Sequence, residues 1–195
     1  MVWLVCQNDI MVDNPTEKDL YTVGTIAKIK VVRKKEGFMR VTFTGMRRAK
    51  LAKLYDSKEL MYADVIPLND SYGDKSEEYA LVKKVVDKLE GMTQVAAVFP
   101  PEVVQQLSLG VNAESLGDQF GQYFSLFDQA TRQRLLETTN VNDRLLLIVE
   151  ELEKQQRYSE LETVINDRVK ERIDDGQKEY YLREKLKAIK EELGD

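Results

Sequence analysis

The sequence predicts an α+β protein, in which a small antiparallel β subdomain is followed by an α-helical bundle with a long C-terminal helix. Residues 1–70 are rich in short β-branched and alternating runs, whereas apolar residues recur at helical spacing from about residue 76. The charge changes at the same place. Residues 1–70 carry 12 Lys/Arg and 9 Asp/Glu, and residues 71–195 carry 17 and 25, which together give the 29 basic and 34 acidic residues of the chain. A domain boundary is therefore expected near residue 70.

The β subdomain, residues 1–70, is expected to be built from short strands. Lys34–Gly37 is a polar loop with a glycine available for positive φ, and it predicts a β-hairpin between the strands on either side. Cys6 is expected to pack in the core beside Leu4 and Val5. The expected strands are residues 2–5, 25–33, 40–44, 46–54 and 59–67.

The bundle, residues 71–157, is expected to contain several short helices. Their starts and ends are indicated by Ser76 as an N-cap, Gly91 as a stop, Pro100-Pro101 as a start and Gly110 as a stop. Two further helices are predicted around 129–138 and 142–153. An aromatic-faced core helix is predicted through Leu116, Phe120, Phe124 and Phe127 with Tyr123 beside them, and the expected buried side of 142–153 is Leu145, Ile148, Val149 and Leu152.

A long charged helix is predicted over residues 158–195. Its apolar residues recur every three or four positions, while 17 of residues 166–195 are charged, so the apolar seam is narrow. Gly176 interrupts it, either as a hinge or as a tolerated glycine. A helix of this length reaches roughly 50 Å, more than the width of a small domain, so its far half is expected to pack against a partner or a following module. The candidate assembly and linker residues are Leu182, Leu186, Ile189 and Leu193.

The sequence excludes the common kinds of catalytic centre. It has no histidine, a single cysteine, and no glycine-rich phosphate loop ending in Gly-Lys. We therefore expect no catalytic, cofactor-binding or metal-ligating residues. No apolar run approaches the roughly 20 residues of a membrane span, so no membrane association is expected, and one cysteine without an export leader favours the cytoplasm.

A basic segment supports an alternative function. Between Lys28 and Lys53 the chain carries ten basic residues and one acid, Glu36. On a small sheet these residues could attract phosphate groups, with Phe38 available for stacking, which would make a nucleic-acid-binding module. They could equally be solvated faces and protected edges of antiparallel strands.

Three stretches resemble the N-terminal region of bacterial ATP-dependent Lon proteases, and the resemblance runs over nearly the whole chain. They read LYTVGTIAKI at 20–29, VTFTGMRRA at 41–49 and QKEYYLREKLKAIKEELG at 177–194, of which the last is the most specific. The resemblance implies a PUA-like β subdomain, then a helical bundle whose last helix leads into an ATPase module and a Ser-Lys protease domain. ATP and Mg would belong to that ATPase module, which this sequence lacks.

The resemblance also implies a function without catalysis in this chain. The region would recognise unfolded or damaged protein substrates and take part in hexamer assembly of a serine endopeptidase. Candidate substrate-binding residues are Phe38 and Met39 at the hairpin and Met46 beside the next arginines. Members of the family carry roughly forty residues, with a further strand and helix, before the position matching Val2. Either this chain is a fragment or it begins at an internal methionine, and an open sheet edge could then be filled by another chain.

Overall fold

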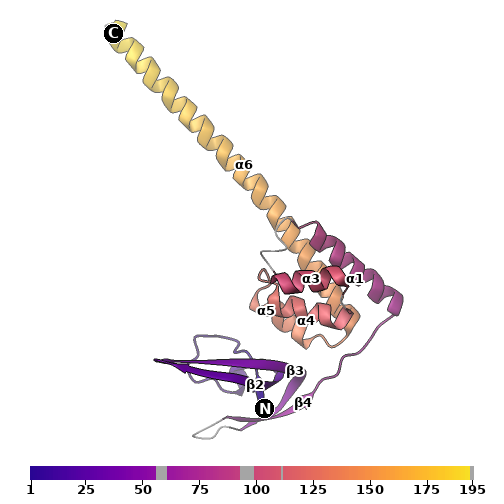
Figure 1. The fold of residues 1–195 in the computed structure, drawn as a ribbon. Helices are drawn as coiled ribbons and strands as arrows, with labels where there is room; N and C mark the ends of the chain where they lie inside the picture. Colours follow the sequence, from indigo (N-terminus) through magenta and orange to yellow (C-terminus); the bar gives the residue numbers. More distant parts are fainter. Residues whose placement is uncertain (56–60, 93–98, 111, 194–195) are drawn as a thin grey trace. The chain divides into compact units, whose positions relative to one another are not determined.

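The computed structural model describes residues 1–55, 61–92, 99–110 and 112–193 (Figure 1). Two compact units are present, Met1–Val149 and Glu150–Asp195, and each is described by itself. The domain limits that the sequence suggests, near residues 70 and 157, stay a prediction. Both the sheet and the short helices lie in the first unit.

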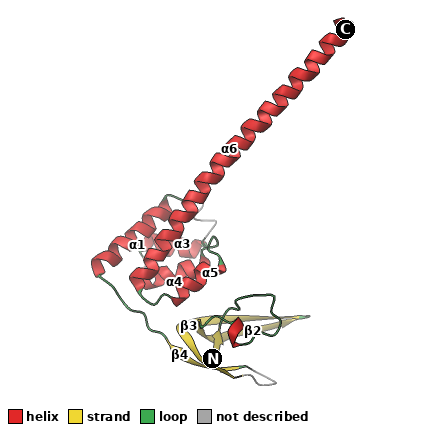
Figure 2. Cartoon of the chain, turned by 180° about the vertical axis from the view of Figure 1, so that it is seen from behind, coloured by secondary structure: helices red, strands yellow, loops and turns green. Residues whose placement is uncertain are grey.

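The predicted antiparallel sheet is confirmed, with its strands in the order β1-β2-β3-β4 (Figure 2). A short 3₁₀ helix, Glu17–Asp19, lies between the first two strands. The strands are β1 (Val2–Leu4), β2 (Val23–Lys35), β3 (Phe38–Tyr55) and β4 (Tyr62–Pro67). Part of the strand predicted at 59–67 lies outside the described residues.

The predicted hairpin is confirmed, but β3 is longer than expected. Gly37 has φ +77° in the turn between β2 and β3, a conformation that glycine adopts without steric cost. The two strands expected at 40–44 and 46–54 are one strand of 18 residues. Gly45 does not end the first of them, because it pairs with Ala27 inside the ladder, and the extra residue at this point is taken up by a β-bulge.

The expectation that Cys6 packs in the core was wrong. β1 ends at Leu4, two residues earlier, and the Cys6 side chain is exposed. The buried apolar positions of the sheet lie instead at Val23 and Ala27 on β2 and at Ala49 on β3. Cys6 is held through its backbone, whose carbonyl oxygen accepts a hydrogen bond of 3.0 Å from the Tyr21 N–H.

The described residues of the first unit form four short helices after the sheet. The N-cap of α1 is Asp74 rather than Ser76, because the Asp74 carboxylate accepts from the N–H groups of Ser76 and Glu77 at 2.9 and 3.0 Å. Gly91 ends α1 as predicted. The helices are α1 (Lys75–Glu90), α3 (Pro101–Leu109), α4 (Ala113–Tyr123) and α5 (Gln129–Glu137).

The aromatic core is confirmed, although its helix is shorter than predicted. α4 ends at Tyr123, so Phe124 and Phe127 lie beyond it, yet both rings are buried with Phe120 and Phe99. Their centroids are 4.6 to 6.0 Å apart in tilted or edge-on contacts. The Arg132 guanidinium donates to the backbone carbonyls of Phe124 and Phe127, both at 3.0 Å. These carbonyls are therefore satisfied without a continuing helix.

The last helix is a single element, α6 (Val141–Leu193), of 53 residues. Two helices were expected here, at 142–153 and from 158 onward, but no breaker separates them and the chain stays helical through Gly176. The predicted buried side is confirmed, since Leu145, Ile148, Val149 and Leu152 are all buried. From residue 156 to residue 192 every side chain is exposed. The side chain of Leu193 lies outside the described residues.

The exposed apolar residues of α6 spread over a wide arc of the helix rather than one narrow seam. Successive residues of an α-helix are rotated by about 100°. A first stripe, spaced by four, therefore drifts around the axis, and its mean direction lies roughly 110° from that of a second stripe near the C-terminal end. The first stripe is Leu161, Ile165, Val169 and Ile173, and the second is Leu182, Leu186 and Ile189.

The exposure of the second stripe predicts a small effect on the stability of this chain. Replacing Leu182, Leu186 and Ile189 together by Ser should lower Tm by a few degrees at most, because these side chains lose little buried area. Leu145→Ser is the control, since it empties a fully buried position and should cost about 3–5 kcal/mol. Thermal melts of both variants compare them, and a triple variant as unstable as the control would show that this part of α6 is buried in solution.

Candidate functional site

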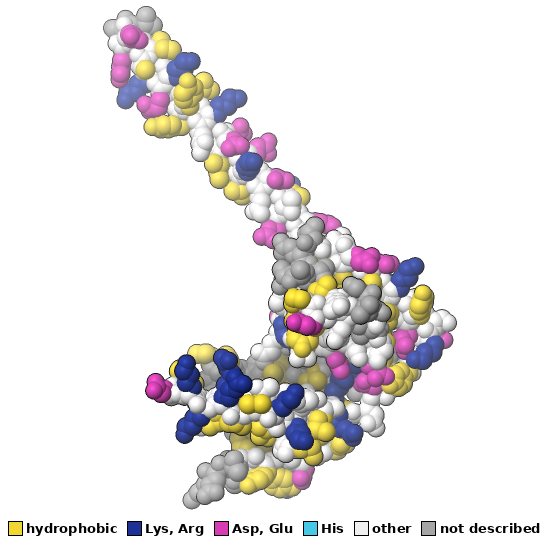
Figure 3. Space-filling view, in the orientation of Figure 1, with side chains coloured by type: hydrophobic (Ala, Val, Ile, Leu, Met, Phe, Trp, Pro, Cys, Tyr) yellow, Lys and Arg dark blue, Asp and Glu magenta, His cyan; other side chains and the backbone are white. Residues whose placement is uncertain are grey.

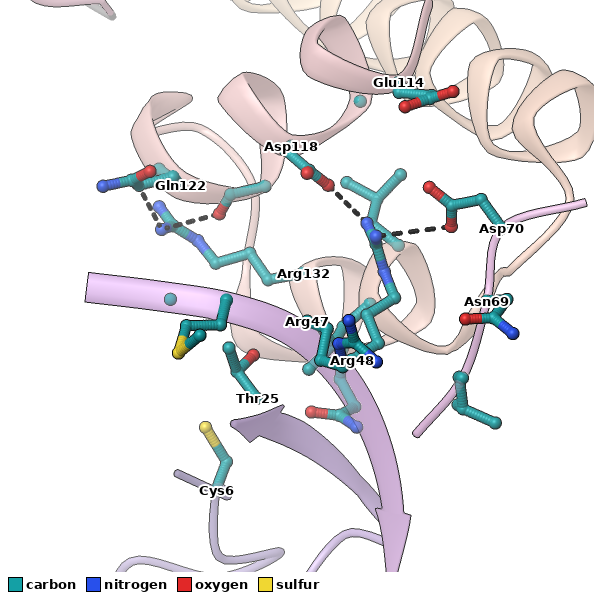
Figure 4. Close-up of a pocket in the computed structure, with 18 of the residues that line it drawn as sticks. Cys6, Thr25, Arg47, Arg48, Asn69, Asp70, Glu114, Asp118, Gln122 and Arg132 are labelled. Carbon is teal, nitrogen blue, oxygen red and sulfur yellow. Dashed lines mark hydrogen bonds and ion pairs between the residues drawn. The ribbon is translucent and has the colours of Figure 1, made fainter. Parts of the chain in front are cut away.

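An open cleft of about 1210 Å³ lies in the first unit, where β3 passes the helices α4 and α5 (Figure 4). Phe43 and Met46 of β3 contribute apolar side chains to its lining, and Cys6 reaches it from the segment after β1. Asp118 of α4 and Arg132 of α5 contribute charge. The cleft is therefore mixed in character, with sulfur and aromatic groups beside ionised ones.

A cluster of four charged side chains lies beside this cleft, and three of them, Arg48, Asp70 and Asp118, line it. Asp70 is shared by two arginines: its Oδ1 lies 2.5 Å from Arg144 Nη2 and 3.4 Å from Arg48 Nη1. Arg48 also pairs with Asp118, and Figure 4 shows its guanidinium between the two carboxylates. Arg144 Nη1 lies 3.8 Å from Asp118. The four residues come from β3, the segment after β4, α4 and the start of α6, so the cluster joins the sheet to the helices.

Arg144 is the buried member of this cluster. It is 0% exposed, and its Nε donates to the Thr138 carbonyl at 2.9 Å. Gly117 on α4 provides the space it needs, because a Cβ at that position would lie only 2.6 Å from Arg144 Cδ. The arginine guanidinium stays charged even when it is buried. The folded state is therefore stable only because these partners compensate the charge.

Further polar contacts fix the same junction. The buried Gln133 side chain on α5 donates to the Val23 carbonyl of β2 at 2.9 Å. Tyr72 donates its phenolic hydrogen to Glu114 on α4. This hydrogen bond, with partial desolvation and the nearby negative charge of Glu114, raises the pKa of Tyr72 above its ordinary value. The first unit is therefore held together by polar contacts as well as by its apolar core.

The β2–β3 hairpin has two faces of different chemistry. Directly paired residues of an antiparallel ladder place their side chains on the same face, and residues alternate along each strand. The apolar face carries Ile29 opposite Phe43, Val32 opposite Val41, and Met39 opposite Lys34. The basic face carries Lys28, Arg33, Lys35 and Arg40, with Val31 and Phe38 beside them. Figure 3 shows basic and apolar side chains over this part of the sheet.

The three side chains predicted to bind substrate are all exposed, but they do not form one group. Phe38 is 81% exposed and lies on the basic face, whereas Met39 is 65% exposed and lies on the apolar face. Met46, 58% exposed, is at the bulge and lines the cleft. Their role stays a prediction.

Some residues of this region were not found from the sequence. Ile29, Val32, Val41 and Phe43 extend the apolar face, and the alternation of residues 38–44 together with the hairpin register could have indicated them. The Arg48–Asp70–Asp118–Arg144 cluster has no sequence signal, because its members lie far apart in the chain. Because Arg48 is ion-paired within this cluster, it does not contribute a free charge to the basic surface proposed for residues 28–53.

The described part of the chain shows no group of three or more His, Cys, Asp or Glu residues arranged to hold a metal ion. Among the described helices, none is both long and apolar enough to cross a membrane. Three of the charged groups at the cleft, Arg48, Asp70 and Asp118, are ion-paired within the cluster that holds the fold together. The outer part of the hairpin is exposed on both of its faces.

The sheet followed by helices defines an α+β domain whose fold is that of Lon N-terminal domains. A solved structure titled "N terminal domain of Mycobacterium avium complex Lon protease" matches with a TM-score of 0.60 and 23% identity, over 71% of this chain and 74% of that chain. A family model described as "ATP-dependent protease La (LON) substrate-binding domain" matches residues 1–154. The chain therefore belongs to the Lon substrate-binding domain family.

Curated relatives support the same family along the entire chain. The Lon protease of Escherichia coli (strain K12) is 32% identical over 195 residues, which is 100% of this chain and 25% of that protein. The Lon protease of Syntrophomonas wolfei is 34% identical, over 100% of this chain and 24% of that protein. The chain thus spans about a quarter of the length of the curated relatives that it matches.

The charged cluster predicts unequal costs for its two carboxylates. Asp70→Ala should destabilise the chain by about 3 kcal/mol, because it leaves the buried Arg144 guanidinium without its closest anionic partner. Asp118→Ala is the matched control and should cost less than about 1 kcal/mol, since the Asp118 side chain is 58% exposed. Urea unfolding of both variants measures the difference. Equal losses of unfolding free energy in the two variants would mean that Asp70 is no more important than Asp118 for stabilising Arg144.

Proposed function

We propose that this chain is the non-catalytic substrate-recognition domain of an ATP-dependent Lon-type serine protease, and that it binds unfolded or damaged polypeptide. The observation that carries the proposal is the apolar face of the hairpin, where Ile29, Val32, Met39 and Phe43 are exposed side by side. Contiguous exposed apolar surface is typical of binding sites. Membership of the substrate-binding family supports the same function.

The apolar face suits weak binding to many sequences. It is open on one side, and it borders the cleft through Phe43, so a flexible apolar chain can lie along it without entering a closed pocket. Methionine at two of the candidate positions, Met39 and Met46, adapts to differently shaped side chains. Weak single contacts become effective when several copies act on one chain, which is the expected benefit of a hexamer.

Assembly is the second part of the proposal. The two exposed stripes of α6 would pack against other copies of the chain or against the ATPase module of the longer protein. Leu182, Leu186, Ile189 and Leu193 are the proposed assembly and linker residues. ATP and Mg would bind to that ATPase module, and Ser-Lys catalysis would belong to a protease domain, both outside this chain. We place the whole protein in the cytoplasm.

Nucleic-acid binding through the basic face is the alternative function. Its supporting observation is that Lys28, Arg33, Lys35 and Arg40 form no ion pair with the described residues. Binding of this kind falls steeply with salt, because it releases counterions, whereas apolar capture does not. The salt dependence of binding therefore separates the two functions.

The proposed function predicts that the two faces of the hairpin differ in substrate capture. Val32→Thr with Met39→Thr should weaken the binding of alkylated, unfolded lysozyme roughly fivefold, because two apolar contacts are lost while β propensity is kept. Val31→Thr is the control on the opposite face and should change binding less than twofold, that is by under roughly 0.4 kcal/mol. Fluorescence titration at low and high salt gives the affinities. A larger effect of the control than of the double variant would contradict capture by the apolar face.

A second prediction concerns catalysis. The isolated chain should hydrolyse neither ATP nor an unfolded protein, because it has no phosphate loop and because the proposed Ser-Lys protease domain lies outside it. Phosphate release and the appearance of peptide fragments measure the two activities. Turnover that co-purifies with the chain through several columns and is lost on heat unfolding would contradict the prediction.

A further inference from the structure

We propose that the free edge of β3 at residues 38–44 binds substrate as an added β-strand, and that it selects segments in which apolar and acidic residues alternate. The inference rests on the proposed function and names the class of polypeptide that this site accepts. It follows from three features of the hairpin: its unpaired edge, the different chemistry of its two faces, and an unneutralised pair of arginines.

The outer part of the hairpin pairs only with itself in the described chain. β1 reaches β2 at Thr25–Ala27, and β4 reaches β3 at Ala49–Tyr55. Beyond these points residues 28–35 and 38–44 form a two-stranded ribbon, whose outer N–H and C=O groups have no strand beside them. Such an edge can hydrogen-bond a further extended chain, which is the basis of β-augmentation.

The edge of β3 suits an added strand better than the edge of β2. The register between the strands shifts at Ile29/Val31, which leaves Lys30 as an extra residue on β2. Over residues 38–44 β3 has no such interruption, and its residues alternate regularly between the faces. An added strand can therefore keep one register along several residues of β3.

The two faces then set the sequence of the segment. Every second side chain of the added strand lies on the apolar face, beside Met39, Val41 and Phe43. The side chains between them lie on the basic face, next to Arg40. Apolar residues are favoured in the first set and acidic residues in the second, because cross-strand neighbours of opposite charge stabilise a sheet.

The positive charges of the basic face are not neutralised by ion pairs with the described residues. Arg33 lies directly opposite Arg40, and Lys35 follows on the same face. Like charges placed opposite each other destabilise a ladder, and the described residues contribute no carboxylate ion-paired with any of these three. A glutamate or aspartate on the added strand, opposite Arg40, supplies the missing charge. A nucleic acid could supply phosphate, but it could neither continue the backbone ladder nor cover the apolar face.

The test uses the 195-residue chain and fluorescent synthetic peptides of about eight residues, a length typical of strands. One peptide alternates Val with Glu, a second alternates Val with Lys, and a third repeats the Val-Glu sequence with every peptide nitrogen methylated. The Val-Glu peptide should bind at least about tenfold more tightly than the Val-Lys peptide, because its carboxylates meet Arg40 and its neighbours. The methylated peptide should not bind measurably, because it cannot donate to the ladder.

Charge reversal identifies the face. Arg40→Glu should remove the preference for the Val-Glu peptide and improve binding of the Val-Lys peptide, which a merely misfolded variant would not do. Lys83→Glu is the matched control, because it makes the same charge change at an exposed position of α1, and it should leave both affinities unchanged.

Other outcomes overturn the inference in recognisable ways. Equal binding of the methylated and unmethylated peptides would mean that no strand is added. Competition by duplex DNA that abolishes binding of both peptides would make the basic face a polyanion site instead. If Val-Glu and Val-Lys bind equally while alkylated lysozyme is still captured, the alternation rule fails and the proposed function stands. If alkylated lysozyme is not captured at all, the proposed function itself fails.

Discussion

The buried guanidinium of Arg144 is the constraint on which the arrangement of the first unit depends. Its charge is permanent, so a carboxylate must accompany it into the protein, and Asp70 does so at 2.5 Å. Asp70 also holds Arg48 of β3, and Arg48 holds Asp118 of α4. Gly117 must remain without a side chain to leave room for the arginine. One buried charge thus fixes β3, the segment after β4, α4 and the start of α6.

This anchoring does not extend to the far part of the hairpin. Arg48 is next to Ala49, where the pairing of β3 with β4 begins. The ion pair and the β4 ladder therefore hold the same end of β3. Residues 28–35 and 38–44 have only each other as ladder partners in the described chain, and an isolated two-stranded ribbon is marginally stable. Binding surfaces are commonly drawn from such regions of low local stability.

Much of this fold follows from periodicity, and the exceptions have physical causes. The alternation around residues 38–44 and the helical spacing after residue 76 predict the sheet, the hairpin and most helices. Side-chain contacts decide the remainder. Arg132 satisfies the carbonyls of Phe124 and Phe127, which lets the chain leave the helix while the aromatic spacing continues. The cluster around Arg144 pairs residues as far apart as Asp70 and Arg144, and no local pattern indicates such a pairing.

The feature of the hairpin that needs a physical explanation is the position of its basic residues on one face, rather than their number. Edge lysines that merely prevent aggregation need only interrupt an apolar edge, and one charge on either face is enough for that. Here Arg33 and Arg40 are directly opposed and Lys35 lies on the same face, while the opposite face keeps Val32, Val41 and Phe43. Concentrating like charges on one face destabilises the ribbon more than distributing them would. That cost has a physical rationale when a bound segment brings carboxylates to one face and apolar side chains to the other.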